Sequence, residues 1–176
     1  MAEEKKDPWL NYLALTTVIL AVCATLSTFK GGGYSTRGVI SQAQASDQWA
    51  YYQAKGVKQY LYQVQRDNLA LQREALPADS KAIGAFDARI ADYSKKVTQY
   101  DTEKHQIEDK ARQLEAQRDE AQQHGKPFGI AVIFLQVAIL ISSIAGLFKR
   151  KALWWGALPV GLVGLAYFAD GFFLFM

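Results

Sequence analysis

The fold of this chain is decided by residues 128–148, FGIAVIFLQVAILISSIAGLF. These 21 residues carry no charge, and about 20 apolar residues in a helix are enough to cross the hydrocarbon core of a bilayer. Phe128 and Phe148 stand at the two ends, where the membrane–water interface favours aromatic side chains. The segment is therefore predicted to be a transmembrane helix.

Two further segments have the same character. Residues 9–29 are uncharged, and residues 152–176 contain one charge, Asp170. Aromatic residues such as Trp9 and Trp154 again lie near the ends. Three buried helices in a soluble core would be the alternative, but the rest of the chain is too short to cover them. The sequence predicts an all-α membrane protein with three transmembrane helices.

The first apolar segment also has to be compared with a cleaved signal peptide. Its apolar stretch is long for such a signal, and no small-x-small cleavage site precedes Lys30. Cys23 follows the bulky Val22, which argues against a lipoprotein signal. We expect Cys23 to be a packing residue of the first transmembrane helix.

The average composition hides this division of the chain. Hydrophobic residues make up 50% of the 176 residues and charged residues 21%, but nearly all charges lie before position 8, between 30 and 126, and at 149–151. That distribution excludes a single compact soluble domain. The single cysteine excludes a disulfide framework, and a net charge of +3 gives no argument for binding nucleic acid.

Short basic loops predict how the chain is oriented in the membrane. Lys5 and Lys6 precede the first apolar segment, and residues 149–151 are Lys-Arg-Lys. Since short cytoplasmic loops are enriched in Lys and Arg, both should be cytoplasmic, with the hairpin and the C-terminus on the other side. The expected parts are an N-terminal tail 1–8, helices 9–29, 128–148 and 152–176, an extramembrane hairpin 30–127 and a basic turn 149–151.

The extramembrane segment is predicted to contain two long helices. In the second, apolar residues alternate spacings of three and four, which is typical of a heptad seam against a partner helix, with Lys104 and Arg118 as interruptions. The residues of this seam are Ile83, Phe86, Ile90, Tyr93, Val97, Tyr100, Lys104, Ile107, Ala111, Leu114, Arg118 and Ala121.

A noisier seam precedes it, at Ala50, Ala54, Val57, Leu61, Val64, Asn68, Leu71 and Ala75. Asn68 could set the register, as a lone Asn does in coiled coils. Between the two seams, Pro77 disfavours helix and Asp79 or Ser80 can cap the next one, so the tip should lie near 76–80. Together the seams predict a long antiparallel coiled-coil hairpin, with arms of roughly 60 Å at 1.5 Å per residue.

Glycines near both ends of the hairpin predict joints. Gly31, Gly32 and Gly33 follow the first apolar segment, and Gly125 and Pro127 precede the second. A phosphate-binding loop is the alternative for the three glycines, but it would require a flanking strand and a Gly-Lys-Ser/Thr ending, which the sequence lacks. We expect a bend at each place.

Aromatic residues are numerous early in the first arm and cannot all face one two-helix seam. Trp49, Tyr52 and Tyr60 fall beside the predicted seam, which favours packing against another subunit over a peptide or ligand surface. The predicted oligomer or partner interface comprises Trp49, Tyr52, Tyr60, Phe86, Tyr93 and Tyr100.

No catalytic constellation is recognisable. His105 and His124 have no Cys or Glu at ligand spacing and are expected to be solvated helix residues. The acidic residues of the hairpin alternate with basic ones, as on a solvated helix face. We expect a protein without enzymatic activity, cofactor or metal.

Polar residues inside the apolar segments limit how the helices pack. Gln136 lies near the middle of its segment and is expected to bond across helices. Asp170 should lie near the outer interface, where a carboxylate stays wet. Pro159, with Gly156, Gly161 and Gly164, should kink the third helix or let a neighbour approach. Small residues also form stripes, Ala14, Thr17, Ala21, Ala24 and Thr28 on the first helix and Ala131, Ala138, Ser142 and Ala145 on the second.

The N-terminal third also resembles a known family. The matching stretches are residues 8–14, PWLNYLA, residues 27–35, STFKGGGYS, and residues 46–55, SDQWAYYQAK. They are similar to a bacterial family of small membrane proteins described only as a domain of unknown function. The resemblance covers most of the chain and implies a bacterial inner membrane and the same three-helix plan. It implies no activity, ligand or catalytic residue.

Two functional hypotheses follow. The first is a structural or scaffold protein, a homo-oligomer whose hairpins associate with each other or with an envelope protein. The second is a subunit of an oligomeric channel or transporter, supported by Gln136, Asp170 and Pro159 alone. An ion path would require a denser polar face, so the scaffold is the preferred hypothesis.

Overall fold

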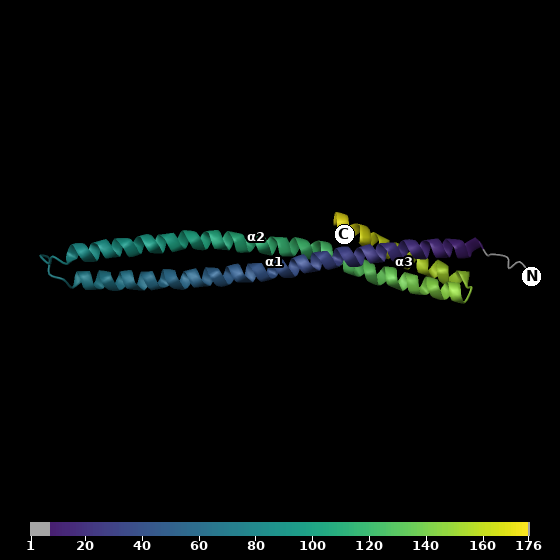
Figure 1. The fold of residues 1–176 in the computed structure, drawn as a ribbon, viewed down its shortest axis with the longest axis horizontal. Helices are drawn as coiled ribbons and strands as arrows, with labels where there is room; N and C mark the ends of the chain where they lie inside the picture. The colour runs from purple at the N-terminus through teal and green to yellow at the C-terminus, as the bar shows by residue number, and fades with distance from the viewer. Residues whose placement is uncertain (1–7, 176) are drawn as a thin grey trace, which may run out of the picture. The chain divides into compact units, whose positions relative to one another are not determined.

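The computed structural model describes residues 8–175, and that part of the chain consists of three α-helices and no strand. The helices are α1 (Pro8–Glu74), α2 (Ile83–Leu147) and α3 (Lys151–Phe173) (Figure 1). Each contains a stretch long and apolar enough to cross a membrane. The expected all-α membrane protein with three such helices is confirmed, while residues 1–7 of the predicted tail and Met176 lie outside the described residues.

The chain divides into two compact units, and α1 and α2 contribute to both. The membrane unit contains the chain up to Ile40 and from Gln117 onward, and the hairpin unit comprises Ser41–Ala116. All three apolar stretches belong to the membrane unit.

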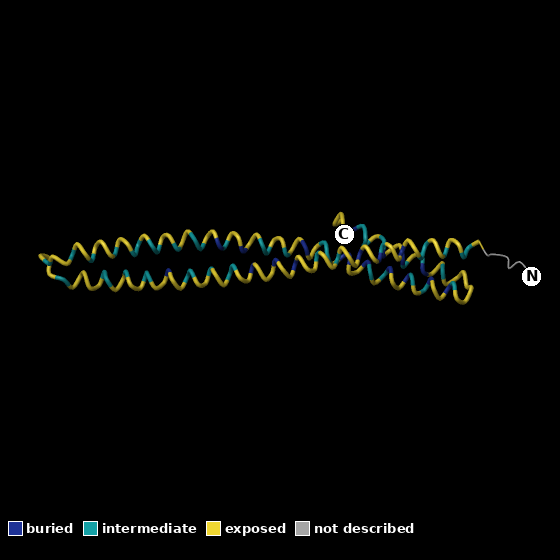
Figure 2. The backbone as a smooth tube through the Cα atoms, in the orientation of Figure 1, coloured by how far each residue is buried: buried dark blue, intermediate teal, exposed yellow. Residues whose placement is uncertain are grey.

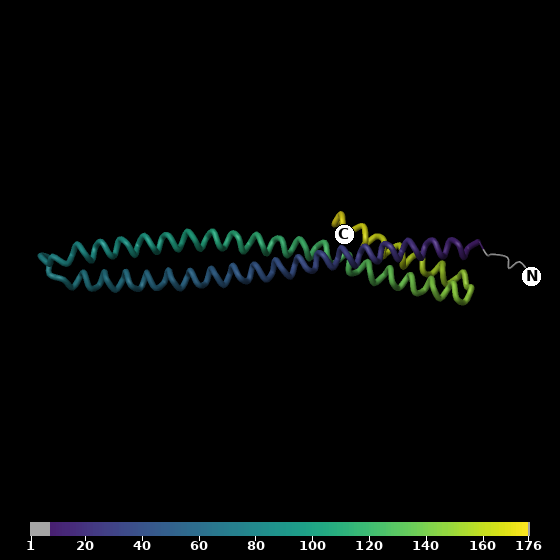
Figure 3. Tube along the Cα trace, in the orientation of Figure 1, coloured from purple at the N-terminus to yellow at the C-terminus, as the bar shows by residue number. Residues whose placement is uncertain are grey.

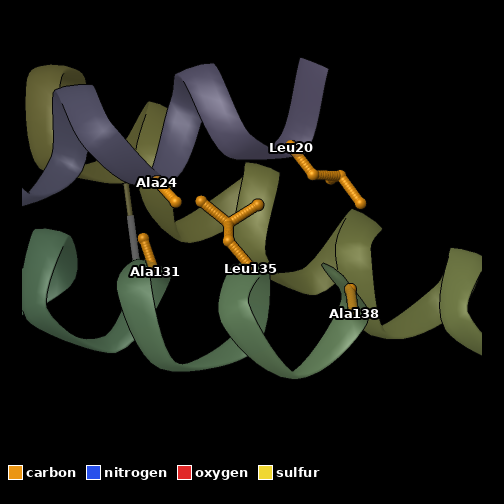
Figure 4. Close-up of a cluster of buried hydrophobic side chains, with 5 residues drawn as sticks. All are labelled: Leu20, Ala24, Ala131, Leu135 and Ala138. Atoms are coloured by element: carbon orange, nitrogen blue, oxygen red, sulfur yellow. The ribbon is translucent and has the colours of Figure 1, made fainter. Parts of the chain in front are cut away.

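The core of the membrane unit is built from small residues and leucines. Leu135 extends from α2 toward α1 and lies beside Leu20 and Ala24 (Figure 4). The small-residue stripe expected on the second apolar segment is confirmed as a packing face, since its members Ala131, Ala138, Ser142 and Ala145 are all buried. Small side chains let helix backbones approach closely, which is how helices associate in lipid.

The stripe expected on the first apolar segment is only in part a packing face. Its member Ala24 is buried, but Ala14, Ala21 and Thr28 are exposed. Leu20 and Ser27, which lie outside the stripe, are buried. This segment has small residues on more than one face, so residue size alone did not identify the packed face.

Two of the three glycines expected to let a neighbouring helix approach α3 do so. A Cβ on Gly164 would lie 2.8 Å from Leu135 Cγ and 3.0 Å from the Leu135 backbone nitrogen. On Gly161 a Cβ would lie 3.1 Å from Leu20 Cδ2. A Cβ on Gly156, by contrast, would meet no atom of another element within 4 Å. Gly161 and Gly164 therefore let α3 pack against α1 and α2.

Neither predicted joint interrupts its helix. α1 is continuous through Gly31, Gly32 and Gly33, and α2 is continuous through Gly125 and Pro127. A glycine inside a helix costs only about 1 kcal/mol relative to alanine, which tertiary packing readily offsets. Packing does so at Gly31, where a Cβ would lie 3.1 Å from the Cβ of the buried Phe128. The continuous helix also excludes a phosphate-binding loop at these glycines.

The tip of the hairpin is where the sequence places it. α1 ends at Glu74 and α2 begins at Ile83, with Pro77 in the connection (Figure 3). The Ser80 carbonyl accepts from the Ile83 N–H at 3.2 Å, and its hydroxyl accepts from the Ala82 N–H at 3.3 Å. Ser80 thus satisfies N–H groups at the start of α2, as a capping residue does.

Within the hairpin unit, α1 and α2 run side by side in opposite directions (Figure 1). Successive contacts join Arg73 to Asp87, Tyr62 to Tyr93, Lys55 to Glu103 and Trp49 to Glu115. The residue numbers of these contacts decrease along α1 as they increase along α2, which is the pattern of an antiparallel pair of helices.

The two predicted seams have different outcomes. From Ile83 to Leu114, every residue of the α2 seam is buried or half-buried, so that face packs on α1 as expected. The α1 seam is on the wrong face, because all eight of its residues are exposed. The α1 residues that contact α2 follow a frame shifted by about two positions and are largely polar or aromatic: Trp49, Tyr52, Lys55, Gln59, Tyr62 and Arg73. A search for apolar periodicity therefore selects the other face of this helix.

Candidate interaction surface

The inner face of α1 is held to α2 by specific polar contacts. The Lys55 ammonium donates to Glu103 Oε2 at 2.6 Å, with both side chains partly sheltered from solvent. The Lys55 hydrogen bond lowers the pKa of Glu103, with a second contribution from Gln99. The same bond to Glu103 raises the pKa of Lys55. The pair favours one register of the hairpin because only that register brings the two charges together.

A polar layer adjoins this pair and explains the interruption of the α2 seam at Lys104. Gln59 is buried, and its amide donates to Asp101 Oδ1 at 3.1 Å. Lys104 donates to Gln59 Oε1 at 3.1 Å and lies 4.8 Å from the ring centroid of Tyr52. Buried polar groups must be bonded to be tolerated, and here each of them is.

An aromatic cluster lies on the tip side of the polar layer. The Tyr62 ring packs edge-on to Tyr93 at 5.4 Å and stacks on Tyr100 at 5.7 Å between centroids. The Lys96 ammonium lies 5.0 Å from the Tyr62 centroid, in the position of a cation–π contact. Tyr62 is therefore the main aromatic contact of α1 with α2, although it is not among the interface residues predicted from the sequence.

Trp49 and Tyr52 were expected to lie beside the contact between α1 and α2. In the structure they are part of that contact. The Trp49 indole N–H donates to Glu115 Oε1 at 2.9 Å, and its ring packs edge-on against Tyr52 at 5.6 Å. Both side chains are half-buried within the single chain. The argument that these two rings require a second subunit therefore fails.

The other predicted interface residues divide in the same way. Phe86, Tyr93 and Tyr100 are half-buried on the face of α2 that packs on α1. Tyr60 is different, since it is 65% exposed on α1. Of the six, only Tyr60 lies on a surface that is open in the single chain.

That surface is the outer face of α1. The mistaken seam residues form a stripe, called the α1 stripe below. It is made of Ala50, Ala54, Val57, Leu61, Val64, Asn68 and Leu71, with Ala75 directly after the end of α1. Val57 is 61% exposed, Leu61 57% and Leu71 65%. In Figure 2 exposed positions recur along the hairpin part of α1. Large apolar side chains are thus presented to solvent at regular helical intervals.

The outer face of α2 has the opposite chemistry. In the hairpin unit every exposed large hydrophobic residue is on α1, and none lies between Ile83 and Ala116. The exposed residues of α2 there include many charged ones, among them Asp87, Arg89, Asp92, Lys95, Asp109, Lys110 and Arg112. One side of the hairpin is therefore suited to water and the other to an apolar partner.

In the membrane unit, Gln136 does not bond across the helices of its own chain. It is exposed on α2, and no hydrogen bond joins its side chain to any described residue. A polar side chain facing lipid is costly near the middle of a span. The bond across helices that the sequence predicts for Gln136 is therefore not made within the described part of the chain.

Asp170 is not at a wet position, contrary to expectation. It is 3% exposed, and its Oδ1 accepts the Phe175 backbone N–H at 2.7 Å. Its backbone carbonyl accepts the N–H of Leu174, where the helix terminates in a left-handed residue. The carboxylate accepts the Phe175 N–H beyond the end of α3, which is a structural role.

His124 is a contact that the sequence did not reveal. Its Nδ1 lies 2.8 Å from the Gly171 carbonyl oxygen, and its ring stacks on Tyr34 at 5.0 Å. Since a carbonyl oxygen only accepts, Nδ1 carries the proton in this arrangement. The expectation of a solvated side chain is wrong for His124, whose partners are distant in sequence, whereas His105 is exposed.

Within residues 8–175 no group of three or more His, Cys, Asp or Glu side chains is placed to hold a metal ion. The features that stand out are therefore surfaces, the α1 stripe first among them.

Comparison with known proteins gives a family and nothing finer. No curated protein and no solved structure matches the chain. A family model matches residues 9–174, nearly its whole length. The chain belongs to the family described as Domain of unknown function (DUF4337).

Proposed function

We propose that this protein is a non-enzymatic, homo-oligomeric scaffold of the membrane, in which the helical hairpin mediates assembly or binds an envelope protein. The observation that carries the proposal is the exposed α1 stripe. A hairpin of this charge content belongs in water, where each exposed leucine or valine loses about 1.5–3 kcal/mol relative to burial. A surface with several such residues in one row is typical of an interaction site.

Gln136 supports the same proposal from the membrane side. Its side chain is exposed on α2 with no partner among the described residues. A helix of another subunit could supply the missing hydrogen bond, which is worth about 1–2 kcal/mol in model transmembrane peptides. Two separate observations, one in each unit, thus favour contact between chains.

The proposed location is the bacterial inner membrane, with the N-terminus in the cytoplasm and the hairpin and C-terminus in the periplasm. The basic turn between α2 and α3, which contains Lys149 and Arg150, supports this orientation. All copies would share it, so closed cyclic symmetry is the favoured arrangement. We further propose that α1 and α2 wind around each other as an antiparallel coiled coil, which the spacing of the α2 seam favours.

The alternative function, a channel or transporter subunit, would require a row of polar side chains along the apolar helices. We find no such row in the described part of the chain. Asp170 satisfies the end of α3 with its carboxylate, and Pro159 lies within the continuous helix α3. Of the three residues on which this alternative rested, Gln136 and Pro159 are exposed, but only Gln136 has a polar side chain that could line a path.

The proposal is tested by co-purification of two copies with different affinity tags. Both are expressed in one cell, and the first tag is captured in mild detergent. We expect the second copy to be captured with it. The control mixes separately expressed copies after extraction, so that association formed only in detergent is recognised. Capture no greater than in a control with an unrelated three-span protein would contradict homo-oligomerisation.

A further inference from the structure

We infer that the α1 stripe is covered by the α1 stripe of a second copy, packed parallel and in the same heptad register. The inference rests on the proposed homo-oligomer and names its contact. In such an assembly the two α1 helices lie inside, and the charged outer faces of the two α2 helices remain in water.

The spacing of the stripe requires a helical partner. Its residues alternate intervals of four and three from Ala50 to Ala75, about three and a half heptads. A heptad repeat of this kind is typical of a helix that packs against another helix wound around it. A flat or irregular partner surface would not require such a repeat. The one face of α1 left open by α2 is thus the face patterned for another helix.

The direction of the partner follows from the membrane and from Asn68. Copies that insert in one orientation present their α1 helices parallel. In a parallel pair each position faces its own counterpart, so Asn68 meets Asn68. Asn68 falls at an a position of the stripe, together with Ala54 and Leu61. A lone Asn at an a position is a known device for fixing register, whereas opposite leucine or valine it would be left unbonded.

The flanks of the stripe are compatible with a parallel copy. In a parallel pair a g residue lies near the e residue five positions later on the partner. For the stripe these neighbours are Gln53 with Lys58, Tyr60 with Gln65, and Asp67 with Gln72. No pair brings two like charges together, and the exposed Tyr60 gains a cover.

Cysteine cross-linking tests the inference in native membranes with the full-length chain. Cys23 is first changed to alanine, and a single cysteine is then introduced at the stripe by Ala54→Cys or by Leu71→Cys. The matched control is Gln106→Cys, on the exposed face of α2. Both stripe positions should form disulfide-linked dimers on mild oxidation, at least about tenfold more than the control, because facing a and d positions meet the distance that a disulfide needs.

Because the two cysteine variants lie far apart on the stripe, they also show whether the two α1 helices are parallel or antiparallel. A parallel in-register pair links Ala54→Cys to itself and Leu71→Cys to itself. An antiparallel pair would instead link the two variants to each other when they are co-expressed, and neither to itself. That result would overturn the inference. Unchanged protein level and helicity of each variant show that the fold is intact.

Failure of the inference differs from failure of the proposed function. If tagged copies co-purify but neither stripe variant links, the copies associate through another face and only the inference falls. If the stripe cysteine links to a different protein of the envelope, the second copy is not its occupant and the inference is again overturned. Absence of both co-purification and linking would remove the inference and the homo-oligomer together.

Discussion

At the residue scale, the contact between the arms depends on polar groups that are individually paired. Lys55 bonds Glu103, and Gln59 bonds both Asp101 and Lys104. Such residues are usually solvated on a helix, and apolar patterning gives no sign that they are inside. They were therefore not predictable as contacts, whereas Tyr93 and Tyr100 of the opposite arm were, because their large rings repeat at heptad spacing.

The Lys55–Glu103 pair should be visible in the titration of Glu103. Since the folded-state pKa of Glu103 is lowered, its stabilising effect is present above the unfolded value of about 4.3 and is lost as pH falls through the lower folded value. The raised pKa of Lys55 acts in the opposite direction, so its effect is lost only as pH rises through a value above about 10.4. Carboxyl carbon NMR in detergent micelles measures the first shift.

Lys55→Met should move the pKa of Glu103 back toward its ordinary value. Lys58→Met is the matched control, since Lys58 acts on the pKa of Glu103 only through its charge, without a hydrogen bond. Equal effects of the two substitutions would show that the hydrogen bond is not the main cause.

Two tyrosines two positions apart on α1 should differ in their contribution to stability. Tyr62 contacts Tyr93, Tyr100 and Lys96, whereas Tyr60 is 65% exposed. In detergent that separates the copies, Tyr62→Ala should lower the free energy of unfolding by about 2 kcal/mol, and Tyr60→Ala by no more than about 0.5 kcal/mol. Thermal unfolding followed by circular dichroism compares them. A larger loss for Tyr60→Ala would mean that α1 faces α2 with its other side.

At the scale of the element, apolar periodicity identified partnered faces but not their partners. The α2 seam was predicted correctly because one face of that helix carries the large apolar groups. α1 has two patterned faces, a polar and aromatic one toward α2 and an apolar one toward solvent. The pattern alone could not tell which of them closes the hairpin. The glycines after the first apolar segment do not end α1, since a helix continues through a few glycines when its neighbours hold it in place.

Glycines of α3 provide a matched test of helix packing in the membrane unit. A Cβ on Gly164 would meet Leu135 at 2.8 Å, including its backbone at 3.0 Å, while Gly156 has open space. Gly164→Ala should therefore destabilise the protein by about 1–3 kcal/mol, as overpacking does. Gly156→Ala should change stability by no more than about 0.5 kcal/mol. Thermal stability in mild detergent measures both, and equal effects would contradict the close approach of α3 to α2.

At the scale of the whole molecule, the number and kind of helices were predictable because long uncharged segments have few alternatives. The orientation in the membrane rests on a smaller signal, the basic residues of short loops. The contact of His124 was beyond sequence reasoning, since it depends on which residues meet at the end of α3. Asp170 bonds Phe175 only five positions later, and its burial, not its partner, was what the sequence did not show. The assembly of several chains is inferred from the apolar surface that the single chain leaves exposed, the α1 stripe.

The orientation predicts which parts of the protein a protease can reach. Protease added to intact spheroplasts should cut the hairpin, whose connection around Pro77 is non-helical, and spare the turn at Lys149. A tag at the N-terminus should be degraded only after lysis. Protection of the hairpin until lysis would reverse the proposed topology.

The mass of the detergent-purified particle tests the central claim most directly. One chain has a mass of 19.6 kDa. After subtraction of bound detergent, the account predicts a single species of two or more chains, whose size falls when Leu61→Asp and Leu71→Asp introduce charges into the α1 stripe. A single species of one chain in mild detergent, unchanged by these substitutions, would contradict it.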